Sequence, residues 1–188
     1  MVEKLSAEHA ATVQWLPYLL RPDMPEQGQA VPAAVRARAG QAGSRLKQLA
    51  QVAGLPMVTP EWTSNPRLAH EATEYAREQG KANEFHSVVF RLYYGEGQDI
   101  GSWSVLIEAA REVGLDPDSL QREVQTGRFA PLVEQYIAEA HELGINSVPT
   151  YILNDRYAIV GAQPYAVFQQ AVSRLSAESP DQSAPTDV

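Results

Sequence analysis

The sequence predicts an α/β fold in which a small sheet is interrupted by one large, all-helical insertion. Two observations support this class. Residues 12–20, 150–153 and 157–160 are rich in the β-branched and aromatic residues that favour strands. Between the first two of these segments, residues 31–126 carry apolar residues at helical spacing, punctuated by Gly and Pro. A long helical crossover between two strands favours their parallel pairing, with helices on the faces of the sheet.

The N-terminal residues are predicted to form the end of a helix followed by a strand. Residues 2–11 read as a helix tail, because no capping residue or entry loop precedes Leu5. Residues 12–20 follow as a strand, in which Pro17 indicates an edge position or a bulge. Residues 21–28 are expected to form a rigid loop, since three of them are Pro or Gly.

The central block is predicted to be almost wholly helical. Residues 32–53 are rich in alanine, and Gly40 and Gly43 are expected to split them into two helices. Asn65 and Pro66 supply a side-chain cap and a first-turn proline for the next helix. Further helices are expected over residues 81–94, 103–113, 117 onwards and 129–143.

The C-terminal part reads as a hairpin and a final helix. Gly144 suits the position just past a helix end, and Asn154 and Asp155 suit the turn between strands 150–153 and 157–160. Pro149 opens the first of these strands, where the residues alone favour a plain loop proline over the rarer cis bond. A last helix begins after Gln163 and Pro164, and residues 176–188 are expected to be a disordered tail.

Composition excludes several classes of function. The net charge is −8 and there is no basic cluster, so nucleic acid and anionic lipid are not expected as main partners. No apolar run could span a bilayer and no signal peptide is present, which predicts a cytoplasmic protein without a membrane partner. Cysteine is absent, which excludes disulfides, thiolate nucleophiles and cysteine-bound metals. The four histidines lack metal-ligand spacing, and we expect neither a metal nor a cofactor.

The order of these elements, together with several short motifs, resembles the DsbA family of thioredoxin-fold proteins. The match is closest to its FrnE-like branch of cytoplasmic thiol oxidoreductases and runs from about Thr12 to Leu175. The motifs are residues 15–28, 76–81, 139–144, 147–150 (Ser-Val-Pro-Thr) and 161–164 (Gly-Ala-Gln-Pro). The last two are fairly specific in combination.

The resemblance implies a thioredoxin-like, DsbA-type sheet with a helical insertion. Residues 1–30 and 127–175 would form the incomplete thioredoxin-like domain, and residues 31–126 the inserted helical subdomain. It further implies that Pro149 is the cis-proline of the fold, and that Val148 offers its backbone to an extended peptide or thiol substrate. Because the insertion covers the active site in this family, Asn65 and His70 are candidate substrate-binding residues. The alternative, that Asn65 is a plain helix cap and His70 a surface histidine, is given about equal weight.

The sequence departs from the family in one large respect. Family members begin with a strand that runs into Cys-x-x-Cys at a helix N-terminus, and this sequence has neither, so no catalytic residue is assigned. The missing strand is the first central one, between residues 12–20 and 150–153, and its absence leaves backbone groups unpaired at ~1–3 kcal/mol each. One hypothesis is that Met1 is not the start of the working protein. Another is a redox-inactive relative whose sheet is completed by another chain, for example in a homodimer.

Three functions therefore stay open. The first is a thiol–disulfide oxidoreductase or isomerase, by family. The second is a glutathione-dependent isomerase or transferase of the kappa type, which needs a Ser or Cys that is missing here. The third is a non-catalytic module that binds peptides or proteins at the groove beside Val148 and Pro149.

Overall fold

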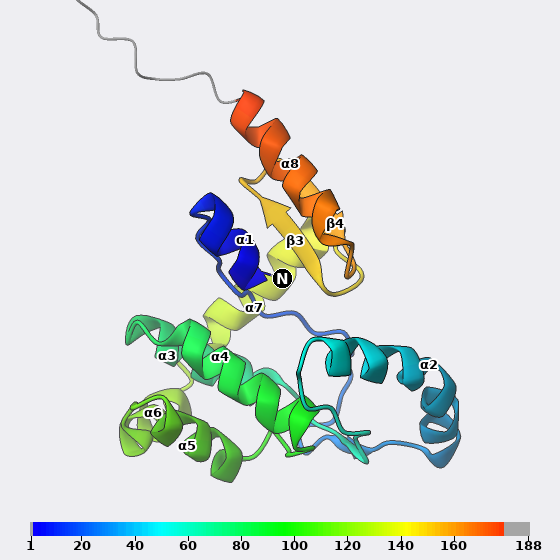
Figure 1. Ribbon diagram of the computed structural model, residues 1–188. Coiled ribbons are helices and arrows are strands. Elements are labelled where there is room, and N and C mark those ends of the chain that lie inside the picture. Colours follow the sequence, from blue (N-terminus) through cyan, green and yellow to red (C-terminus); the bar gives the residue numbers. More distant parts are fainter. Residues whose placement is uncertain (1, 179–188) are drawn as a thin grey trace, which may run out of the picture. The chain divides into compact units, whose positions relative to one another are not determined.

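The computed structural model describes residues 2–178 and shows two compact units (Figure 1). One unit runs from Trp15 to Glu139, and the other joins residues 2–14 to residues 140–178. The sequence predicted boundaries after residues 30 and 126. Residues 15–30 and 127–139 lie in the larger compact unit, and the boundaries of the thioredoxin-like domain and its insertion stay a prediction.

Six helices and one π-helical turn carry the larger unit. They are α2 (Ala33–Val52), α3 (Arg67–Glu78), α4 (Ala82–Phe90), η1 (Arg91–Gly95), α5 (Trp103–Glu112), α6 (Pro117–Gln125) and most of α7 (Ala130–Glu142). The predicted split of residues 32–53 into two helices is wrong, because α2 is continuous through Gly40 and Gly43. Each glycine costs about 1 kcal/mol relative to alanine, and the alanine-rich remainder of α2 favours the helix.

A single apolar cluster packs helices α3 to α6 against one another. The helices contact each other in the pairs α3 with α4, α3 with α6, α4 with α5, and α5 with α6. The largest fully buried apolar side chains of this cluster are Phe85, Leu92, Leu106 and Leu120. Within single helices, buried residues of the cluster lie three or four positions apart, as Ala72 and Ala76 do on α3 and Leu106 and Ala110 do on α5, so the amphipathic pattern accounts for the packing.

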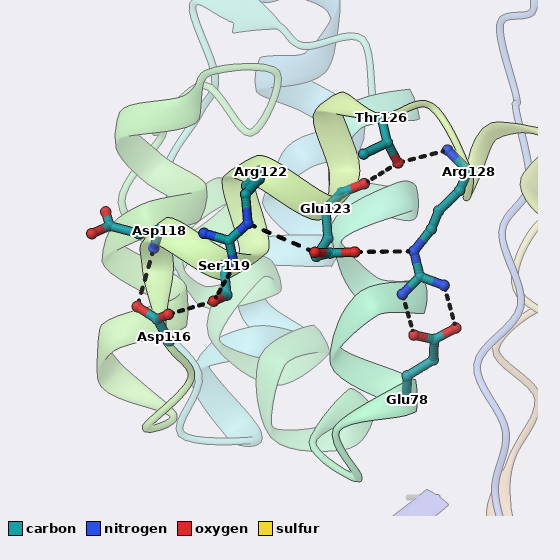
Figure 2. Close-up of polar contacts among 8 residues, drawn as sticks. All are labelled: Glu78, Asp116, Asp118, Ser119, Arg122, Glu123, Thr126 and Arg128. Atoms are coloured by element: carbon teal, nitrogen blue, oxygen red, sulfur yellow. Dashed lines mark hydrogen bonds and ion pairs between the residues drawn. The ribbon is translucent and has the colours of Figure 1, made fainter.

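Charged side chains tie α3 to the turn before α7 on the surface of this unit (Figure 2). Arg128 makes two hydrogen bonds to the carboxylate of Glu78, of 3.1 and 2.5 Å, and an ion pair of 3.4 Å with Glu123. Nearby, Asp116 caps α6 by accepting a hydrogen bond from the N–H of Asp118. All of these groups contact solvent, so each pair is expected to contribute little to stability.

The predicted strand over residues 12–20 is absent. The segment is not assigned to a strand and has no ladder partner among the described residues, so the expected parallel pairing is wrong as well. Its apolar side chains are used differently: Leu19 is buried against Val133 and Ile137 of α7. Strand propensity reflects packing against neighbouring strands, and none of the strands that the structure describes pairs with this segment.

The larger unit also contains a two-residue ladder that the sequence did not predict. Strand β1 (Gln29–Ala30) pairs antiparallel with β2 (Trp62–Thr63). Gly28 precedes β1 with φ +74°, and a Cβ atom there would lie 2.5 Å from the carbonyl oxygen of Thr63. The Trp62 side chain of β2 is 38% exposed.

The smaller unit consists of a β-hairpin covered by two helices. Strands β3 (Thr150–Leu153) and β4 (Tyr157–Val160) pair antiparallel, and both match their predicted bounds. Helices α1 (Val2–His9) and α8 (Tyr165–Glu178) pack on one face, where Leu5, Ile159 and Phe168 form the core. The two helices are also joined by a hydrogen bond of 2.6 Å from the Tyr165 hydroxyl to Glu8.

The predicted tail begins inside the last helix. Helix α8 continues through residues 176–178, and the rest of the predicted tail, residues 179–188, lies outside the described part of the chain. None of the helices that the structure describes combines the length and apolar composition needed to cross a membrane.

Candidate functional site

The Val148–Pro149 loop lies between the end of α7 and the start of β3. Gly144, with φ +70°, ends α7 and donates its N–H to the carbonyl of His141. The Val148–Pro149 peptide bond is cis, which confirms the expectation from the family resemblance. The Pro149 carbonyl accepts a 2.7 Å hydrogen bond from Gly161, so the loop is fixed to the strand opposite.

The register of the hairpin decides which backbone groups of β3 are free. The bond between Gly161 and Pro149 marks a hydrogen-bonded pair, and Thr150 faces Val160 as the next pair. Since bonded and non-bonded pairs alternate along an antiparallel ladder, the backbone groups of Tyr151 point toward β4. Those of Thr150 and Ile152 therefore point away from β4, toward the outer edge of β3.

This outer edge is open. Among residues 2–178, β3 has β4 as its only neighbour in the sheet, and the N–H and C=O groups of Thr150 and Ile152 make no backbone hydrogen bond outside the β3–β4 ladder. The outer edge of β4 is partly capped, because the Gln163 side chain donates a 2.9 Å hydrogen bond to the carbonyl of Val160. An open row of donors and acceptors is a template for another strand.

Asn65, a predicted site residue, belongs to the helical unit, where its side chain is buried and fully engaged. Its amide nitrogen donates to the carbonyls of Met24 and Pro25, at 3.0 and 3.3 Å. Its amide oxygen accepts from the N–H of Arg67, at 3.0 Å, at the start of α3. The side chain thus joins the 21–28 loop to α3, and a contact with substrate stays a prediction.

His70, the fourth predicted site residue, is a largely buried side chain of α3. Burial lowers the pKa of His70 from 6.5 to about 4; the charge of Arg67 lowers it too, and a hydrogen bond with the backbone of Tyr18 opposes both. Its Nε2 atom is buried and has no hydrogen-bond partner among the described residues. A neutral imidazole can accept a proton or a hydrogen bond there, but His70 is not the surface histidine of the alternative expectation.

The structure also shows an aromatic column that the sequence interpretation missed. Trp15 stacks on His86, with ring centroids 4.2 Å apart and ring planes 16° from parallel. Phe90 and Tyr94 continue the column, at 4.2 Å and 5.4 Å between successive centroids. Burial, followed by the charges of His70 and Arg77, lowers the pKa of His86 to about 4. The four-residue spacing of His86, Phe90 and Tyr94 was the available signal, because it places them on one helix face.

The chemistry available to this chain is limited by its residue types. No cysteine occurs in the 188 residues, so none of its own groups can form the mixed disulfide of thiol–disulfide exchange. Within the described range, no group of three His, Asp or Glu residues could hold a metal ion. What the arrangement offers is backbone hydrogen bonding at the edge of β3, next to an exposed loop.

Comparison with known proteins places the chain in a family. Residues 1–173 match the family described as DSBA-like thioredoxin domains. The uncharacterized protein YwbO of Bacillus subtilis (strain 168) is 31% identical over 164 residues, which cover 86% of this chain and 80% of YwbO.

Solved structures agree on the fold. A probable DsbA oxidoreductase of Streptomyces coelicolor, SCO1869, superposes with a TM-score of 0.77 at 25% identity, over 88% of this chain and 75% of that one. A 2-hydroxychromene-2-carboxylate isomerase superposes with a TM-score of 0.76 at 19% identity, over 97% of this chain and 90% of that one. The isomerase is similar in fold alone.

Proposed function

The chain belongs to the family of DSBA-like thioredoxin domains, and from this premise we propose that it binds extended polypeptide segments along the Val148–Pro149 loop and β3. The observation that carries the proposal is the unpartnered backbone of Thr150 and Ile152 at the open edge. A strand added there makes main-chain hydrogen bonds, the source of affinity in β-strand addition. Each such bond is worth about 0.5–1.5 kcal/mol net.

Binding without thiol chemistry is the function that the residues of this chain can carry out. A thiol–disulfide reaction, as the name of the Streptomyces relative suggests, would need cysteines from outside these 188 residues. A kappa-type reaction would need an active-site Ser or Cys that no motif supplies. Within the family, residues 147–150 and 161–164 favour the FrnE-like branch.

The first experiment measures peptide binding by fluorescence anisotropy. The probe is a labelled peptide with the core Val-Ile-Val-Tyr-Val between lysine pairs, compared with two versions that are N-methylated on alternate core residues. Only one edge of a bound strand pairs with β3, so one methylated peptide should lose at least about tenfold in affinity while the other binds like the parent. Unchanged binding of both methylated peptides, or no binding of the parent, would contradict the proposal.

A pair of variants locates the binding to β3. Ile152→Pro removes an outward N–H from β3, and Ala158→Pro removes the corresponding N–H from the outer edge of β4. Both positions lie in non-bonded pairs of the ladder, so neither substitution removes a hydrogen bond between β3 and β4. Ile152→Pro should abolish peptide binding and Ala158→Pro should preserve it, with circular dichroism reporting that both variants are folded.

A further inference from the structure

We infer that the segment bound by β3 is an uncharged strand with apolar side chains on both of its faces, rather than one that alternates apolar and polar residues. This inference rests on the proposed function, because it specifies the ligand of the same edge. It follows from what borders the open edge on each face of the hairpin and from the absence of charge there.

The first face continues the core of the smaller unit. Tyr151 and Leu153 of β3 pack against a buried cluster. This cluster is formed by Leu5 of α1, Ile159 of β4 and Phe168 of α8. The Tyr151 and Phe168 rings meet edge to face, with centroids 4.8 Å apart. Side chains directly opposite each other on paired strands lie about 4.5–5.5 Å apart, so alternate residues of an added strand would lie beside Tyr151 and Leu153. Apolar side chains fit this position.

The opposite face is also apolar, but it is exposed. Ile152 is 43% exposed and Val160, on the neighbouring strand, is 53% exposed. Val148 is 48% exposed just before β3. Leu143 and Ile152 line an open hollow whose other border is formed by Asp155 and Arg156 of the turn and by the start of β4. The remaining residues of an added strand would cover Ile152 on this face. Strands whose two faces are both buried have continuous apolar sequences.

The edge lacks charge along its whole length. Residues 144–153 contain no Asp, Glu, Lys or Arg, and the charged residues that bracket this stretch are Glu142 and Asp155. Exposed edge strands are usually protected by charged side chains, especially Lys, and β3 has none. A charged ligand residue on β3 would lose its hydration without finding a counter-charge on the strand itself. The charged residues that share the hollow with Ile152 lie in the turn, where Arg156 already pairs with Glu178 at 2.8 Å. The electrostatic match is therefore with an uncharged segment.

The test compares the Val-Ile-Val-Tyr-Val probe with two peptides whose cores are Val-Ser-Val-Ser-Val and Ser-Ile-Ser-Tyr-Ser, all between the same lysine pairs. Each serine peptide keeps one apolar face and the full backbone, so only the second face differs. The apolar probe should bind at least tenfold more tightly than either serine peptide. In the protein, Ile152→Ser should reduce the affinity for the apolar probe severalfold. Val52→Ser, at an exposed position of α2, should leave this affinity unchanged.

The outcomes separate this inference from the proposed function. If a serine peptide binds as tightly as the apolar probe, and N-methylation still weakens binding, the edge takes a strand but the two-faced preference is wrong. If no peptide binds, the proposed function fails. If the chain alone forms a dimer in light scattering that Ile152→Pro dissociates and Ala158→Pro does not, a second copy occupies the edge, which overturns the inference of a separate ligand.

Discussion

Replacing Arg77 by Met should destabilise the helical unit strongly, because it would leave a buried carboxylate without its partner. Glu74, one turn earlier on α3, has a side chain that is only 2% exposed. Arg77 holds it through two hydrogen bonds, of 2.9 Å from Nε and 3.2 Å from Nη2. The Nη2 atom also donates a 2.6 Å hydrogen bond to the backbone carbonyl of Trp15. One side chain therefore neutralises Glu74 and fixes the extended segment.

The expected cost is about 3–5 kcal/mol, the range for breaking a buried ion pair by removing one partner. This is a large fraction of the roughly 5–15 kcal/mol that stabilises a typical domain. The double variant Glu74→Met, Arg77→Met should recover much of the loss, because it no longer buries an unpaired charge.

Urea unfolding followed by circular dichroism gives the free energy of unfolding for each variant. The matched control is Arg128→Met, which removes a pair whose side chains are 45% and 48% exposed in Arg128 and Glu78. Exposed pairs contribute about 0.2–1 kcal/mol, so this variant should stay close to the unsubstituted chain. If Arg77→Met costs no more than Arg128→Met, the buried pair of Glu74 and Arg77 does not stabilise the helical unit.

Two further predictions concern the same unit. The pKa of His70 lies near 4 in the folded chain against 6.5 unfolded, so unfolding takes up a proton between these pH values and stability falls as the pH drops from about 6.5 to 4. At about 1.4 kcal/mol per pKa unit, His70 accounts for a loss of about 3 kcal/mol in the free energy of unfolding. Urea unfolding across this pH range should therefore show that the free energy of unfolding depends less steeply on pH in His70→Gln than in the unsubstituted chain. An equally steep dependence in the variant would count against His70 as its source. Gly28→Ala should lower the free energy of unfolding, measured by heat or urea, by at least about 2 kcal/mol. Two costs add there: an alanine in the left-handed backbone conformation, and a clash of its Cβ atom with the carbonyl oxygen of Thr63. Gly54→Ala, with φ +68° and open space, should cost about 1 kcal/mol, and equal losses at the two sites would refute the clash.

Much of the helical structure could be predicted from local signals. Asn65 and Pro66 open α3, Asp116 caps α6, and the hairpin follows from a turn at Asn154 and Asp155, both with positive φ. These signals act within a few residues, so the sequence displays them directly. Residues 12–20 were misjudged because strand propensity counts only where a neighbouring strand exists.

The candidate site could be predicted only in part, for the same reason. The loop at Val148 and Pro149 followed from its motif, but the free groups of Thr150 and Ile152 depend on the register of β3 against β4. A shift of one residue would turn those groups toward β4, and sequence alone does not determine the register this finely. The isolation of His70 Nε2 depends on tertiary packing and left no signal in the sequence.

Amide hydrogen exchange at β3, followed by NMR with and without the Val-Ile-Val-Tyr-Val peptide, shows directly whether a strand adds to the open edge. The N–H groups of Thr150 and Ile152 point to the open edge, so they should exchange rapidly in the free chain and become protected when the peptide binds. The N–H groups of Tyr151 and Leu153 point toward β4 and serve as internal references that change much less. Protection of Thr150 and Ile152 on binding would support strand addition at this edge. Peptide binding that leaves both amides exchanging as in the free chain would contradict it.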